Sequence, residues 1–180
     1  MSTRKLIYHV AISIDGFIAE KNDSIDLFPT EGDHIPDYVD SLAKYDTAVM
    51  GRRTYEFGYK YGMKPGDNPY PHMNTFVYSS QLRFDKKDDN LKVIRTNIVP
   101  HVRLLKRRSG APIYLCGGGV IASYLLDQGM IDEIHLKSCP IVMGSGIPMF
   151  NGLLEGINLE RVHTKSYDNG VMLLHYKVLK

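Results

Sequence analysis

The sequence predicts an α/β protein: a three-layer fold with a mostly parallel central sheet, helices on both faces and a C-terminal antiparallel hairpin. Short apolar runs alternate along the chain with segments whose apolar residues recur at helical spacing, which is typical of parallel strands joined by helices. Near the C-terminus, two apolar runs flank Asp168-Asn169-Gly170, a sequence that favours a tight hairpin turn.

The strands are expected where apolar runs end at turn-forming residues. The predicted strands cover 6–14, 47–50, 74–78, 91–94, 113–116, 131–139, 158–166 and 171–178. Between them, 17–24 is expected to form a loop or hairpin-like excursion. The range 58–73, rich in Gly, Pro, Tyr and Asn, is expected to be a long loop, and loops of that length are often functional.

Helices are expected where apolar residues recur every three or four positions. One covers 33–45, with Asp33 as a possible cap, a second covers 97–108, with Asn97 as its cap, and a third begins at the glycines 117–119 and stops near Gly129. The residues at helical spacing are Tyr38, Val39, Leu42 and Ala43 in the first helix. In the second helix, Ile98, Val102 and Leu105 are expected to face inward, and in the third, Val120, Ile121, Tyr124 and Leu125 would form one apolar face.

Composition indicates an ordinary globular protein. The chain has 180 residues, 43% hydrophobic and 23% charged, which predicts a single domain over 1–180. A net charge of +2 is too small to indicate nucleic-acid binding. No apolar run approaches the roughly 20 residues that span a membrane. Residues 1–5 lead directly into a strand rather than a signal peptide, so we expect a cytoplasmic protein.

The cysteines and histidines show no metal-binding pattern. Cys116 and Cys139 lie in apolar strand-like runs and are expected to be buried thiols, which suits a cytoplasmic setting. The seven histidines have no H-x-x-x-H spacing, and no C-x-x-C is present. We therefore expect no metal site.

Three predicted strands end in polar or glycine-rich clusters. Because parallel strands bind ligands at their carboxyl ends, these clusters indicate a binding site. The clusters are Gly51-Arg52-Arg53-Thr54, Ser79-Ser80 and Gly117-Gly118-Gly119. Arginine forks, hydroxyl groups and the free N–H groups of a helix start all suit phosphate.

Taken separately, each cluster has a plainer interpretation as a strand-to-helix turn, a pair of solvated charges or a polar strand end. Their coincidence at three strand ends instead suggests a dinucleotide that carries a pyrophosphate and a 2′-phosphate, which is NADPH. The glycine spacing is neither G-x-G-x-x-G nor the P-loop pattern.

The same clusters resemble a known family. The segments 49–56, 77–81 and 115–119 are similar, in order and spacing, to the three cofactor motifs of the dihydrofolate reductase superfamily. The segments 10–19 and 140–150 resemble one branch, the reductase domain of the bifunctional riboflavin-biosynthesis deaminase-reductase and its single-domain relatives. The resemblance covers nearly the whole chain and implies a dihydrofolate-reductase-like fold.

The resemblance implies an NADPH-dependent reductase of a pyrimidine- or pterin-like substrate, most like 5-amino-6-(5-phosphoribosylamino)uracil reductase, and a homodimer. By position, the phosphate-holding residues would be Gly51, Arg52, Arg53, Thr54, Ser79, Ser80, Gly117, Gly118, Gly119, Val120 and Ile121. Ala11 and Ile18 would lie beside the nicotinamide. The superfamily's glycine pair implies a cis peptide bond between Gly117 and Gly118.

The sequence also departs from the family patterns. It contains no tryptophan, whereas true dihydrofolate reductases carry one after the first strand, and neither Asp33 nor Asp37 aligns cleanly with their acidic residue. The deaminase half and its zinc signature are absent from this sequence. Asp15 is the candidate substrate-binding residue, with a turn-forming Asp-Gly as the equal alternative. A dihydrofolate or pteridine reductase, a non-catalytic NADP(H)-binding protein and a partner-binding domain remain alternatives.

Overall fold

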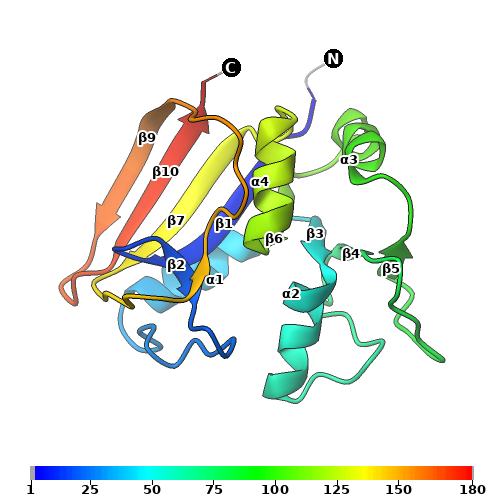
Figure 1. Cartoon of the computed structure of the whole chain (residues 1–180), viewed down its shortest axis with the longest axis horizontal. Helices are drawn as coiled ribbons and strands as arrows, with labels where there is room; N and C mark the ends of the chain where they lie inside the picture. The colour runs from blue at the N-terminus through cyan, green and yellow to red at the C-terminus, as the bar shows by residue number, and fades with distance from the viewer. Residues whose placement is uncertain (1–2, 180) are drawn as a thin grey trace.

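An eight-stranded sheet runs through the molecule in the order β5-β4-β3-β6-β1-β7-β10-β9 (Figure 1). The computed structural model describes residues 3–179, so Met1 and Ser2 of the N-terminal stretch, and Lys180, lie outside the described residues. The sheet strands are β1 (Leu6–Ser13), β3 (Thr47–Gly51), β4 (Asn74–Tyr78), β5 (Leu91–Ile94), β6 (Ile113–Gly117), β7 (Glu133–Cys139), β9 (Leu159–Ser166) and β10 (Met172–Val178).

The strand directions confirm the predicted fold class. From β5 to β7 every neighbouring pair is parallel, whereas β10 runs antiparallel to β7, and β9 runs antiparallel to β10 at the sheet edge. The predicted loop after β1 instead contains β2 (Phe17–Ala19), which pairs with β8 (Ile147–Pro148) in a small antiparallel sheet. These strands are too short and too irregular to be recognised from alternation in the sequence.

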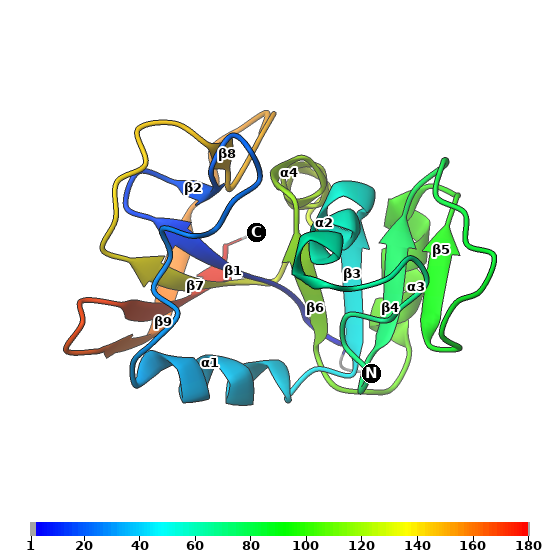
Figure 2. The same cartoon turned by 90° about the horizontal axis from the view of Figure 1, so that it is seen from below.

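Helices cover both faces of the sheet, as predicted (Figure 2). They are α1 (His34–Leu42), α2 (Arg52–Phe57), which leads into the 3₁₀ helix η1 (Gly58–Tyr61), α3 (Ile98–Arg107) and α4 (Gly119–Asp127). Leu105 of α3 and Leu125 of α4 pack in one core with Leu115 of β6. Tyr55 of α2 and Leu42 of α1 pack in a second core, with Met50 of β3, and Phe28, Cys139 and Val171 form a third, smaller cluster. No helix in the described part of the chain is both long and apolar enough to cross a bilayer.

The apolar residues at helical spacing are not all buried in two of the helices. In α4, Val120 is 67% exposed and Tyr124 42% exposed, whereas Ala122, Leu125 and Leu126 are buried. Nearly every position of α4 is apolar, so periodicity alone does not identify the buried face. In α1, Val39 is 56% exposed, and His34 is the residue of this helix that is buried.

The two predicted helix caps have different outcomes. The Asn97 side chain accepts a hydrogen bond from the Val99 N–H at 3.1 Å, which confirms it as the cap of α3. Asp33 has helical backbone angles and makes no capping hydrogen bond, so its predicted capping role is wrong. A capping side chain needs extended backbone geometry to reach the following N–H groups.

The turn between β6 and α4 differs from the expectation in one respect. No peptide bond among residues 3–179 is cis, so the predicted cis bond between Gly117 and Gly118 is wrong. The chain instead reverses through positive φ values of 126° at Gly117 and 40° at Gly118. Residues with a side chain rarely adopt such angles, which explains why glycines occupy this turn.

Candidate active site

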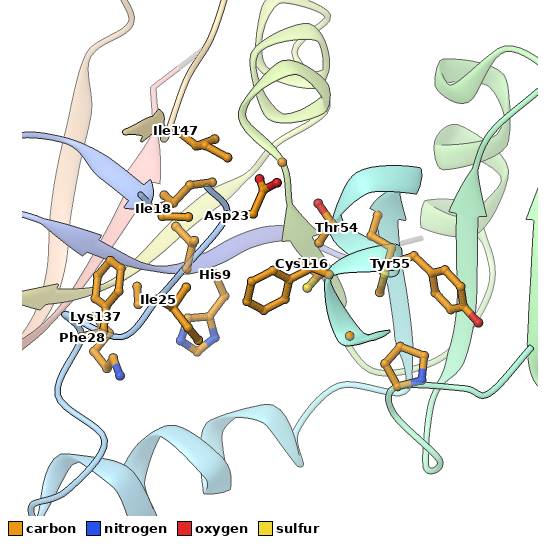
Figure 3. Close-up of a pocket in the computed structure, with 18 of the residues that line it drawn as sticks. His9, Ile18, Asp23, Ile25, Phe28, Thr54, Tyr55, Cys116, Lys137 and Ile147 are labelled. Carbon is orange, nitrogen blue, oxygen red and sulfur yellow. The ribbon is translucent and has the colours of Figure 1, made fainter. Parts of the chain in front are cut away.

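A cavity of about 540 Å³ opens beside the carboxyl ends of the central strands (Figure 3). Its walls come from β1, β6 and β7, from the start of α2, from α1 and from the loop after β2. Apolar side chains such as Ile25 and Phe28 make up most of the lining. A largely apolar cavity with a few polar groups is typical of a small-molecule site.

The structure brings two of the three predicted clusters together. Strands β4, β3 and β6 are neighbours, so their carboxyl ends lie side by side at one edge of the sheet. Arg53 and Thr54 at the start of α2, and Gly118 before α4, all line the cavity. A Cβ atom placed on Gly118 would lie 3.2 Å from Oγ1 of Thr54. The two turns therefore face each other closely.

The two residues expected beside a nicotinamide also lie here. Ala11 of β1 and Ile18 of β2 both line the cavity that Thr54 and Gly118 line. Figure 3 shows Ile18 and Ile147 on neighbouring segments, with Thr54 on the far side of Asp23. This apolar end suits a flat ring, which gains stability from burial in contact with aliphatic side chains.

The remaining predicted cofactor residues lie outside the cavity lining, along the same edge of the sheet. They are Gly51, Arg52, Ser79, Ser80, Gly117, Gly119, Val120 and Ile121. A Cβ on Gly119 would lie only 2.4 Å from the Pro148 carbonyl oxygen, so this glycine is required by packing. Ser79 Oγ accepts hydrogen bonds from the N–H groups of Gln81 and Leu82 at 3.1 and 3.0 Å.

Both predicted arginines are held by carboxylates. Arg52 Nη1 lies 3.1 Å from Glu56 Oε2, one turn further along α2. Arg53 Nη2 lies 3.1 Å from Asp23 Oδ1 in the loop after β2, and its side chain is 72% exposed. Surface ion pairs of this kind contribute roughly 0–1 kcal/mol, so a phosphate can displace the carboxylate at little cost.

Asp15 lies in the turn after β1 and does not line the cavity. Its carboxylate accepts hydrogen bonds from Ser13 Oγ at 2.7 Å, from the Met143 N–H at 3.1 Å and from the Gly144 N–H at 2.7 Å. The Ser13 hydrogen bond is the main cause of the lowered pKa of Asp15. The carboxylate thus ties the β1–β2 turn to the loop before β8, and its assignment to substrate stays a prediction.

Sequence reasoning missed two buried polar residues of the cavity, His9 of β1 and Lys137 of β7. His9 is 2% exposed, and burial lowers its pKa to about 3, so it is a neutral ring whose Nδ1 lies 3.2 Å from the Tyr45 hydroxyl. Lys137 is 7% exposed, and burial lowers its pKa as well. The signal that could have revealed Lys137 is the presence of a lysine inside a predicted strand of a sheet covered on both faces.

His9 is also the first of four histidines that pair across neighbouring strands. The strand registers align His9 with His135, His135 with His175 and His175 with His163. The rings of His135 and His175 stack with centroids 3.7 Å apart. Within residues 3–179, no group of three or more His, Cys, Asp or Glu side chains is arranged to hold a metal ion.

Comparisons with known proteins agree with this architecture. The chain is 30% identical to the uncharacterized protein YyaP of Bacillus subtilis (strain 168), over 98% of this chain and 96% of that protein. A putative riboflavin biosynthesis protein from Shewanella sp. PV-4 superposes with a TM-score of 0.82 at 23% identity, over 97% of this chain and 98% of that one.

A dihydrofolate reductase from Enterococcus faecalis, in complex with NADP(H) and RAB-propyl, superposes with a TM-score of 0.70 at 17% identity, over 98% of this chain and 97% of that one. This confirms the predicted dihydrofolate-reductase-like fold. The model of the RibD C-terminal domain matches residues 4–173 of the chain. The strand-end clusters, the cavity and this match agree, and the chain belongs to the RibD C-terminal domain family.

Proposed function

We propose that this protein is an NADPH-dependent reductase of a pyrimidine- or pterin-like substrate, most like 5-amino-6-(5-phosphoribosylamino)uracil reductase. One observation carries the proposal: Ala11 and Ile18, expected at the nicotinamide, line the same cavity as Arg53, Thr54 and Gly118, expected at the phosphates. Family membership supports a reductase in general terms, and the Enterococcus structure supports NADP(H) as the cofactor class.

The residues present suit this cofactor. A Cβ on Gly51 would meet no atom within 4 Å, so a ligand can approach the β3–α2 turn closely. The first turn of α4 has N–H groups without intrahelical acceptors, which favour a pyrophosphate. Arg83 and Arg95, which donate to the carbonyl oxygen of Leu82 at 2.9 Å, add positive charge beside Ser79 and Ser80. Such charge suits a 2′-phosphate.

Bound NADPH would supply a hydride for reduction of a C=N bond or an open ribosyl imine. The chain itself orients and shields the reactants. Ala11 and Ile18 would bury one face of the ring and exclude water, while Thr54 and the glycine turn would fix the phosphate end. The substrate would occupy the cavity between Ile25, Phe28 and Lys137.

Folate is disfavoured as the substrate. Asp37, one of the two candidates for the acidic residue of true dihydrofolate reductases, is held by Lys165 and Tyr167. It does not line the cavity, and neither does Asp33. A non-catalytic NADP(H)-binding protein remains the second candidate, because no proton donor is assigned to the substrate.

The deciding experiment measures NADPH oxidation against ribosylaminopyrimidines and pterins, alongside thermal shifts with NADPH and NADH. A ligand present at 100 times its Kd stabilises the native state by about 2.7 kcal/mol. Turnover of a ribosylaminopyrimidine is the expected result. Stabilisation by NADPH with no turnover would favour the non-catalytic alternative, and no response to NADPH would contradict both proposals.

We also propose a homodimer in the cytoplasm. Strand β9 supports the dimer, since it is exposed along its whole length at the sheet edge and offers unpaired backbone groups to a second copy. Sedimentation equilibrium at several protein concentrations tests this assembly.

A further inference from the structure

Lys137 is a buried cation without a matching anion. It pairs with Ala11 across the β1–β7 register and lies in the cavity wall. Its side chain is only 7% exposed, yet no carboxylate of residues 3–179 forms an ion pair with its Nζ. Burying an unpaired charge is expensive, so such lysines in cavities often mark a ligand site.

The protein satisfies this ammonium group poorly. A protonated lysine has three donors, and here one N–H reaches the Pro29 carbonyl oxygen at the long distance of 3.5 Å. Nζ also lies 5.3 Å from the centroid of the Tyr38 ring, within reach of a weak cation–π contact. Burial lowers the pKa of Lys137, as expected for an amine that lacks a charged partner. Donor capacity therefore remains for a ligand in the cavity.

The surroundings of Lys137 restrict which ligand group fits there. Figure 3 shows Lys137 beside Phe28 and away from Asp23 and Thr54, so it lies apart from the proposed phosphate end. Asp23 is the only carboxylate that lines the cavity within the described chain, and Arg53 holds it. With Arg53 paired to Asp23, Lys137 is left as one unpaired cation among apolar walls; it matches one negative charge, whereas a phosphate dianion requires more donors.

We propose that Lys137 is the specificity-determining residue of the substrate site and binds a planar substrate through a singly charged anionic oxygen, either a carboxylate or an ionised ring oxygen. This inference rests on the proposed function, because it concerns the substrate end of the same cavity. A pocket with a protein carboxylate binds rings that carry cationic or donor groups, such as an amidine. A pocket with the Lys137 ammonium group has the opposite preference: it binds ligands that present acceptor oxygens and disfavours cationic or donor-rich ring edges.

The test uses three probes of nearly the same shape: benzoate, benzamide and benzamidine. Their affinities are measured by calorimetry with the wild type, Lys137→Met, Lys137→Arg and the control Lys92→Met, an exposed lysine of β5. We expect the wild type and Lys92→Met to prefer benzoate by about tenfold, the effect of one charge-assisted hydrogen bond. Lys137→Met should lose this preference, and Lys137→Arg should retain it.

The melting temperature and the NADPH affinity of the same variants separate the possible failures. Lys137→Met removes an unpaired buried charge, so its melting temperature should equal or exceed that of the wild type. Its NADPH affinity should be unchanged. A wild type that does not bind benzoate, or binds benzamidine equally well, overturns the inference, as does a preference that survives in Lys137→Met. If the wild type does not bind NADPH but still prefers benzoate, the reductase proposal fails while the inference about Lys137 stands.

Discussion

Arg53 and Asp23 form an ion pair at the exposed rim of the cavity, with Nη2 3.1 Å from Oδ1. The same loop is held by Lys60, whose Nζ donates to the Asn22 carbonyl oxygen at 2.6 Å. A phosphate bound at Arg53 must therefore compete with Asp23. If Arg53 binds the cofactor phosphate as proposed, cofactor binding and the position of the loop after β2 would be coupled through this one arginine.

Replacing Arg53 by Ala should weaken NADPH binding about tenfold and leave NADH binding nearly unchanged, because a charge-assisted hydrogen bond contributes roughly 1.5–3 kcal/mol. Arg52→Ala should act in the same direction.

Asp23→Asn should strengthen NADPH binding by up to about fivefold, because it removes the ion pair with which a phosphate at Arg53 competes, and a surface ion pair contributes at most about 1 kcal/mol. Calorimetric Kd values for both cofactors check these predictions, with Arg103→Ala, at an exposed arginine of α3, as the control. Equal wild-type affinity for NADPH and NADH would refute them.

Gly118→Ala should impair cofactor binding more than it impairs folding. The new Cβ would lie 3.2 Å from Thr54 Oγ1, and the φ of 40° is unfavourable for alanine, at a cost of about 1–3 kcal/mol. Gly129→Ala is the matched control, since Gly129 also has a positive φ of 63° but meets no atom within 4 Å and lies beyond the other end of α4. Urea unfolding should show similar losses of stability in the two variants. NADPH titration should show weaker binding in Gly118→Ala and unchanged binding in Gly129→Ala.

Acidification should destabilise the protein through His9. Its pKa is lowered from 6.5 to about 3, so the unfolded chain binds a proton in this interval that the native protein does not. The contribution of His9 to the free energy of unfolding is therefore fully present above pH 6.5. It falls as the pH drops toward 3, by about 1.4 kcal/mol per pH unit. The groups that face His9 are Tyr38, Tyr45, Tyr114 and His135.

His9→Asn should reduce the loss of stability at low pH. The measurement is the free energy of urea unfolding at a series of pH values from neutral downward. His72→Asn, at an exposed histidine, is the control for the loss of an imidazole. His175, whose pKa is lowered to about 4 chiefly by burial, should leave a residual slope in His9→Asn. A loss of stability at low pH that His9→Asn does not change would contradict the assignment of this effect to His9.

Substitution of Asp15 separates its structural role from the predicted substrate role. The hydrogen bonds to the Met143 and Gly144 N–H groups favour a structural role, so Asp15→Ala should speed amide hydrogen exchange at these two positions and lower the melting temperature. Ser13→Ala removes the hydroxyl partner but leaves the carboxylate and should give a milder version of both effects. A rise in KM with normal amide exchange would instead support contact with substrate.

The sheet and its strand ends followed from local sequence, because buried parallel strands read as apolar runs that stop at turn residues. The end of the cavity near Lys137 did not. Lys137 lies in the cavity wall only because β7 pairs with β1 in one register, and register between distant strands is not encoded by spacing within either strand. Asp23 likewise contacts Arg53 only because of how the loop after β2 folds, and the sequence of this loop has no hydrophobic periodicity from which its path could be predicted.

The position of β1 between β6 and β7 has a consequence for the nascent chain. This strand leaves the ribosome well before its two partners, which begin only at Ile113 and Glu133. Until both are made, an apolar strand with two open edges must avoid pairing with other chains, which is a situation that chaperones relieve. A premature stop before β7 would leave β1 open on one side and release an aggregation-prone fragment.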